Sequence, residues 1–130
     1  MNLSSNRLCG VWDDGHGLKG TYTAKGITAI ANALKANASM TELKLSCNSL
    51  KDEGVIAICK ALQSNKETKL ASLDIARNGI GAAGAKAVMA MAAVVGSMTR
   101  LDVRGNYLGE GGRAALRKAL EGRSGFELLL

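Results

Sequence analysis

Three asparagines recur in one frame of apolar residues, and this repetition limits the possible folds more than any other feature of the chain. The frames are Leu43-x-Leu45-x-x-Asn48-x-Leu50, Leu73-x-Ile75-x-x-Asn78-x-Ile80 and Leu101-x-Val103-x-x-Asn106-x-Leu108, each with a glycine six residues after its asparagine. A fourth copy, Leu3-x-x-Asn6-x-Leu8, reaches its glycine, Gly26, only after an insertion of about fourteen residues. Repeats of about 28 residues bury their apolar faces only against one another. The sequence therefore predicts a stack of repeats.

Each repeat has two parts with different periodicities. Apolar and polar residues alternate before each asparagine, which predicts a short strand, and the asparagine is expected to bond backbone groups where the strand ends. After each glycine, apolar residues follow at steps of four, which predicts a helix with one buried stripe. The glycine columns are Gly26, Gly54, Gly84 and Gly112, and the stripe columns are Ile30, Ile58, Val88 and Leu116, then Leu34, Leu62, Ala92 and Leu120. We expect these glycines to allow close helix packing, with a positive-φ turn as the competing explanation.

A strand, a turn and a helix in every repeat require parallel strands with the helices outside, and helices wider than the strand spacing curve the stack. We predict one domain over 1–130, with repeats at 1–39 (carrying the insertion 9–22), 40–69, 70–97 and 98–125, and a fifth strand starting at 126–130. Phe126 and Leu129 are expected to match the columns of Met40 and Leu43. Neither end has a clear polar cap, and two interpretations of these uncapped ends stay open together: the sequence is a segment of a longer repeat array, or copies of the chain associate through the ends into a homo-oligomer.

The frame Leu-x-Leu-x-x-Asn-x-Leu, followed by glycine and a full helix, resembles the ribonuclease-inhibitor-like leucine-rich repeats. The resemblance covers nearly the whole chain and implies an α/β solenoid, a right-handed superhelix with a curved parallel sheet inside and helices outside. Related repeats occur in Ran GTPase-activating proteins and NOD-like receptors, so the resemblance implies a fold more strongly than a function. Ligands of this family usually meet the concave sheet.

We therefore take the polar side chains between the buried strand columns as candidate partner-binding residues. They are Glu42, Lys44 and Ser46 on the first strand, Asp74 and Arg77 on the second, and Arg100, Asp102 and Arg104 on the third. Read across strands, Lys44 should lie beside Asp74, and Asp74 beside Asp102, so that opposite charges could pair and the two aspartates would favour a cation between them. The alternative is a solvated face whose charges pair among themselves. The surface lacks an aromatic anchor of the kind that favours tight protein binding.

The insertion 9–22 is the only segment without the repeat pattern. It contains Trp12 and Tyr22, which we treat as further candidate partner-binding residues, although Trp12 also fits a cover for the end of the stack. Asp13, Asp14 and His16 could surround a divalent metal, but the string Asp-Asp-Gly-His-Gly is first of all turn-forming. A loop without a ligand, a partner-contacting loop and a metal-binding loop all remain open.

Composition and motifs argue against several other classes of protein. The net charge of +6 is spread along the chain rather than gathered on one face, so no nucleic-acid partner is expected. No apolar stretch approaches the roughly 18 residues needed to cross a bilayer, and the start does not read as a signal peptide. Three cysteines without metal-ligand spacing fit reduced thiols in a cytoplasmic protein. Cys59 is expected on a half-buried helix flank. No motif indicates a catalytic site or a cofactor.

These observations lead to a non-catalytic scaffold that binds a protein partner through the concave sheet. Two alternatives stay open. One is a fragment of a GTPase-activating or NOD-like regulatory protein, in which Arg77 or Arg104 contacts a GTPase, and the other is a metal-binding module in the insertion.

Overall fold

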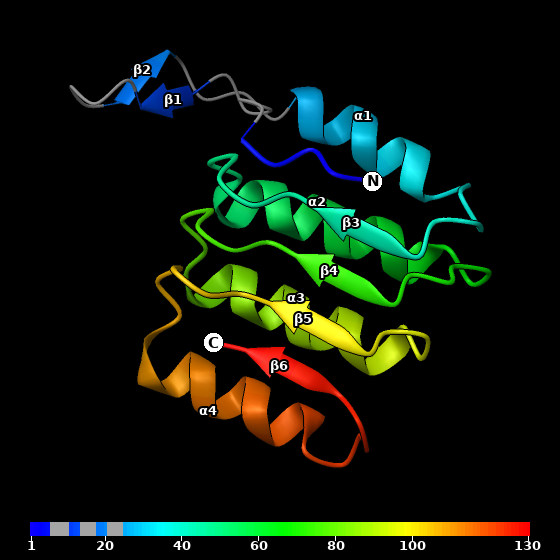
Figure 1. Ribbon diagram of the computed structural model, residues 1–130. Helices are drawn as coiled ribbons and strands as arrows, with labels where there is room; N and C mark the ends of the chain where they lie inside the picture. The colour runs from blue at the N-terminus through cyan, green and yellow to red at the C-terminus, as the bar shows by residue number, and fades with distance from the viewer. Residues whose placement is uncertain (6–10, 14–17, 21–24) are drawn as a thin grey trace.

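The computed structural model of the chain describes residues 1–5, 11–13, 18–20 and 25–130, with 11–13 and 18–20 described by their backbone alone. Within these residues, four helices lie on one side of the sheet and alternate with its strands along the chain (Figure 1). The helices are α1 (Lys25–Leu34), α2 (Lys51–Ser64), α3 (Ala82–Val94) and α4 (Gly109–Leu120). The strands of the sheet are β3 (Glu42–Lys44), β4 (Ser72–Asp74), β5 (Arg100–Asp102) and β6 (Glu127–Leu129). Two further strands, β1 (Val11–Asp13) and β2 (Leu18–Gly20), pair antiparallel with each other.

The sheet is parallel in the order β3-β4-β5-β6, as the repeat frame predicts. The N-terminal residues add a short parallel segment to the sheet beside β3. Asn2 forms a parallel bridge with Lys44, and the Leu3 amide donates to the Lys44 carbonyl at 2.8 Å. Leu3 thus takes its expected place beside Leu45. The α/β repeat solenoid is confirmed.

The core lies between the sheet and the helices. The strand columns Leu43, Leu73 and Leu101, then Leu45, Ile75 and Val103, are buried as predicted. The helix stripe is also buried in α2, α3 and α4, and Met91, which is fully buried, adds volume beside the small Ala92. In α1 the prediction is confirmed for Leu34 and wrong for Ile30, which is only half-buried because this helix turns Ile27, Ala31 and Leu34 toward the core.

Cys59 also differs from the prediction. We expected a half-buried helix flank, but Cys59 is 1% exposed and belongs to the core. Burial raises the pKa of its thiol to about 12. The reason is that α2 lies between α1 and α3 and therefore has neighbours on both flanks.

The repeat glycines lie within the first turn of their helices, and at Gly84 the structure supports the packing explanation. Gly84 is buried, and a Cβ there would stand 2.5 Å from Ile80 Cγ2 and 2.9 Å from Val55 Cγ1. Its φ lies outside the left-handed region, so α3 needs glycine at this point for space.

The C-terminal strand has a register different from the predicted one. Leu128, and not Leu129, pairs with Leu101 and so continues the column of Leu43. The interval from Leu101 to Leu128 is one residue shorter than the interval from Leu73 to Leu101. The sequence did not reveal this difference, because the last strand has no asparagine against which its register could be aligned. Leu128 and Leu130 pack against the core, and both are half-buried.

Within the described residues, no helix combines the length and the apolar character that crossing a membrane requires.

Candidate interaction surface

The buried asparagines form a ladder that fixes the backbone at the ends of the strands. Asn78 Oδ1 accepts hydrogen bonds from the amides of Asn48 (2.8 Å) and Leu50 (3.3 Å), and its Nδ2 donates to the Leu45 carbonyl (2.9 Å). Asn106 repeats this arrangement one repeat later, accepting from the amides of Asn78 (2.8 Å) and Ile80 (3.1 Å). The predicted bonding to strand-end backbone is confirmed. The bonds also cross between repeats, so each asparagine ties its own turn to the preceding one.

The residue before each of these asparagines adopts a left-handed backbone conformation. Cys47, Arg77 and Gly105 occupy this column, with φ values of 58°, 53° and 72°. L-residues rarely adopt such angles, and the ladder holds Cys47 and Arg77 there. The exposed side chain of Arg77 therefore projects from a fixed backbone at the edge of the sheet.

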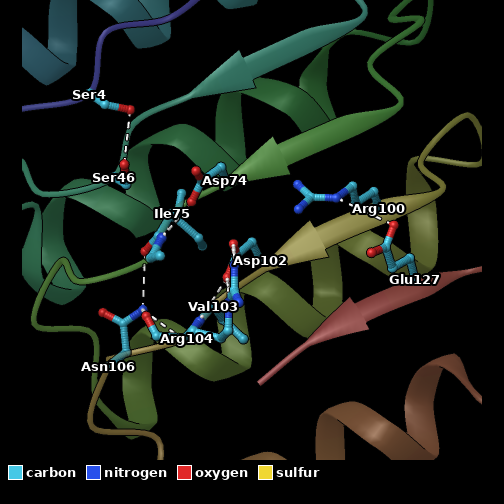
Figure 2. Close-up of polar contacts among 11 residues, drawn as sticks. Ser4, Ser46, Asp74, Ile75, Arg100, Asp102, Val103, Arg104, Asn106 and Glu127 are labelled. Carbon is cyan, nitrogen blue, oxygen red and sulfur yellow. Dashed lines mark hydrogen bonds and ion pairs between the residues drawn. The ribbon is translucent and has the colours of Figure 1, made fainter.

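We call the exposed side of β3, β4, β5 and β6 the strand face, and its register brings the predicted charges together. Lys44 lies beside Asp74, and Asp74 beside Asp102, as expected. The expected pairing of Lys44 with Asp74 was wrong, because the ion pair that Lys44 forms is with Glu42 of its own strand at 3.7 Å. Arg100 pairs with Glu127 of the next strand at 3.4 Å (Figure 2).

Asp102 is the most constrained charge on this face. It is 3% exposed, and Arg104 closes on it with Nε 3.0 Å from Oδ1 and a terminal nitrogen 2.8 Å from Oδ2 (Figure 2). Burial on its own would raise the pKa of this carboxyl, but the hydrogen bonds and charge of Arg104 outweigh it and hold the pKa below its ordinary value. Arg104 thus supplies a cation to Asp102, one of the two neighbouring aspartates.

Five predicted residues line one depression of about 380 Å³ on the strand face, namely Ser46, Asp74, Arg77, Asp102 and Arg104. Ser46 Oγ donates to Ser4 Oγ at 2.9 Å, and Asp74 Oδ1 accepts from the Ala76 amide at 3.0 Å. Glu42, Lys44 and Arg100 lie on the same strands but do not line this depression.

The predictions on the insertion fall largely outside the described residues. Trp12 lies in β1, where only the backbone is described, and Tyr22 lies outside the described ranges. Asp14 and His16 are also outside them, so the metal-binding hypothesis stays a prediction. Among the residues that the structure describes, no group of three metal-ligating side chains comes together.

A second cavity, of about 640 Å³, lies beside the strand face where the strands lead into the helices, and sequence reasoning missed it. It is lined by Ser49, Lys51, Asp52, Glu53, Arg77, Asn78, Gly79, Gly105 and Tyr107. Tyr107 is 79% exposed and supplies the aromatic group that the strands themselves lack. The sequence position of Tyr107 could have indicated its exposure. Tyr107 directly follows the ladder asparagine, at a variable position where the other repeats have Ser49 and Gly79.

The chain matches known leucine-rich repeat proteins. A family model described as Leucine Rich repeat matches residues 36–59 and 66–89. Mouse ribonuclease inhibitor is 36% identical over 94 residues, which cover 72% of this chain and 20% of that protein. RAN GTPase-activating protein 2 of Arabidopsis thaliana is 31% identical over 96 residues, covering 74% and 17% respectively. The chain thus spans a fifth or less of the length of these two relatives.

Solved structures agree on the fold. The actin-binding site 2 of leiomodin-1 superposes with a TM-score of 0.69 at 21% identity, covering 82% of this chain and 62% of that one. The tropomodulin C-terminal domain of Caenorhabditis elegans superposes with a TM-score of 0.76 at 10% identity, covering 100% and 71%. At these identities the likeness concerns the fold alone.

Proposed function

Since the chain belongs to the ribonuclease-inhibitor-like leucine-rich repeat family, we propose that it is a non-catalytic scaffold that binds a protein partner through its strand face. The observation that supports this most is the depression in which five predicted side chains gather, four of them ionisable, over a backbone held by the asparagine ladder. A preorganised surface of this kind reduces the entropy lost on binding.

The charges of the strand face suit a role in specificity. Exposed ion pairs such as Lys44 with Glu42 contribute roughly 0–1 kcal/mol, so a partner can exchange them at small cost. Complementary charges across an interface mainly select the partner and speed its association. A face that binds nothing would hold the same ion pairs, so the test has to compare two faces of one molecule.

The test is a capture experiment with two charge reversals of equal size. Lys44→Glu changes the strand face, and Lys60→Glu makes the same change on an exposed position of α2. We expect a stoichiometric partner that the wild type and Lys60→Glu retain and that Lys44→Glu releases. Equal retention by both variants would contradict binding through the strand face.

A second candidate is regulation of a GTPase, and the observation that favours it is the exposed Arg77 on its fixed turn, in a chain similar to a RAN GTPase-activating protein. Under this proposal a Ran-type GTPase loaded with GTP hydrolyses it faster when the chain is added, and Arg77→Ala removes the stimulation while Lys60→Ala does not. A stable complex without faster turnover would favour the scaffold.

A further inference from the structure

The cavity beside the strand face adjoins the depression on that face. Arg77 and Gly105 line both hollows. We call the surface formed by Arg77, Gly105 and Tyr107 the Arg77 edge. Tyr107 lines the larger cavity and is 79% exposed.

Gly105 determines where the Arg77 side chain lies. A Cβ on Gly105 would stand 2.7 Å from Arg77 Cγ, well inside normal contact, so the aliphatic part of Arg77 rests on the glycine of the next repeat. Lys51 lies over Gly79 in a looser version of this arrangement, with its Cγ 3.8 Å from the place of a Cβ. The side chains of Arg77 and Lys51 thus each lie against a glycine of the following repeat.

Two acids near the Arg77 edge, Asp52 and Asp102, are held by other groups, whereas Glu53 also lines the larger cavity and is exposed. Asp52 turns toward the start of α3, where its Oδ1 accepts from the amides of Gly81 (2.7 Å) and Gly84 (3.0 Å). Asp102 forms an ion pair with Arg104.

The cations of the strand face are occupied too, because Lys44, Arg100 and Arg104 each have an acidic partner. Across the described part of the chain, Arg77 forms no ion pair within 4.0 Å. Arg77 can therefore bind a carboxylate of a partner without first breaking an ion pair within the chain.

Tyr107 adds a contact of a different kind. Its ring is exposed next to the cavity while its backbone is fixed, because the Tyr107 amide donates to the Ile80 carbonyl at 2.7 Å. Tyr and Arg are among the residue types most often found where binding energy concentrates in protein interfaces. A carboxylate on Arg77 and an apolar side chain against Tyr107 could be satisfied by neighbouring residues of one segment.

We propose that the Arg77 edge binds an acidic segment of a protein partner, with a carboxylate on the Arg77 guanidinium and an apolar side chain against Tyr107. This deepens the proposed function and rests on it, because it names the class of segment that leaves the strand face. The net charge of +6 adds long-range attraction for such a segment.

The test uses two fluorescein-labelled peptides, one with three glutamates alternating with leucines and one with glutamines in place of the glutamates, measured by fluorescence anisotropy at low salt. We expect the wild type to bind the glutamate peptide about tenfold more tightly, and Arg77→Ala to reduce this preference to about twofold, the loss of one charge-assisted contact. Tyr107→Ala should weaken both peptides by a similar factor and so leave the preference unchanged.

Two further variants separate position from net charge. Lys60→Ala removes the same charge from α2 and should keep the preference, whereas Gly105→Ala retains Arg77 but displaces it and should reduce the preference. Circular dichroism of each variant checks that the fold is kept. An unchanged preference in Arg77→Ala, an equal loss in Lys60→Ala, or no saturable binding by the wild type would overturn the proposal. The peptides report on the Arg77 edge directly. If the wild type bound no peptide while the capture experiment succeeded, the scaffold proposal would remain intact.

Discussion

At the scale of single residues, the asparagines that follow β3, β4 and β5 each serve two repeats at once. The side chain of Asn78 accepts from two amides of the preceding repeat and donates to one carbonyl of that repeat and one of its own. Removing the side chain takes a partner from several buried backbone groups together. The expected loss is therefore the desolvation cost of those groups, and not the net value of one hydrogen bond.

We expect Asn78→Ala to lower the free energy of unfolding by about 3 kcal/mol, because an unsatisfied buried polar group costs roughly 1–3 kcal/mol and the substitution affects more than one. Urea denaturation followed by circular dichroism measures the change. Asn32→Ala, at an exposed position of α1, is the control and should not lower stability, since alanine favours a helix more than asparagine does. Equal losses at the two positions would contradict a structural ladder.

Cys59 predicts a dependence of stability on pH. Its folded-state pKa is raised to about 12 from an ordinary value of 9.0, so the folded state keeps the thiol proton over a range in which the unfolded state loses it. The stabilising contribution is complete below pH 9 and is lost as the pH rises toward 12. Urea midpoints measured between about pH 8 and pH 11 should fall less steeply in Cys59→Ala, which has no thiol to titrate. An equal pH dependence of the urea midpoint in the wild type and in Cys59→Ala would contradict the burial of this thiol.

At the scale of the elements, α1 and α3 are completed by neighbouring repeats. No side chain of its own N-cap caps α3, but Asp52 of α2 accepts two amides at its start. At the other end of the helices, Asn65 donates to the carbonyls of Leu34 and Asn37, and the Arg123 guanidinium donates to the carbonyls of Ala92, Val95, Gly96 and Met98. Helix ends that would need local caps in an isolated helix are here satisfied across repeats.

Two helical glycines should respond in opposite directions to the same substitution. Gly84→Ala places a methyl group against Ile80, Asp52 and Val55 and should lower the unfolding free energy by about 1–3 kcal/mol. Gly111 in α4 has no neighbouring atom within 4 Å of the place where a Cβ would stand, so Gly111→Ala should raise stability by about 0.5–1 kcal/mol through helix propensity. Thermal and urea unfolding of both variants measure the difference. A stabilised Gly84→Ala would contradict the packing role of this glycine.

At the scale of the whole molecule, the repeats stack in one direction and the last strand remains at the edge of the sheet (Figure 1). In β6 the side chains of Leu128 and Leu129 are half-buried, whereas the outer residues Arg117 and Lys118 of α4 are exposed. The helix layer at this end is thus polar, and the strand layer is not. An edge strand with apolar side chains is a template for pairing with another chain.

We therefore propose that isolated copies associate through β6, and expect a dimer or larger assembly by light scattering at high protein concentration. Leu129→Lys should shift the population toward the monomer, because charged side chains oppose pairing at a sheet edge. Val94→Lys introduces the same charge at a 64% exposed position of α3 and should leave the assembly intact. A monomeric wild type at high concentration would contradict association through the ends.

The repeat frame alone determined the fold, the parallel strands and the buried columns, because every repeat places the same position in nearly the same surroundings. It also located the strand face, since side chains alternate strictly along a strand. Only the tertiary structure decided how individual side chains chose among neighbours at similar distances: Lys44 pairs with Glu42 rather than Asp74, and Arg104 closes on Asp102. The turn of α1, the register of Leu128 and the exposure of Tyr107 beside Arg77 likewise depend on contacts between repeats, which a frame written within one repeat does not contain.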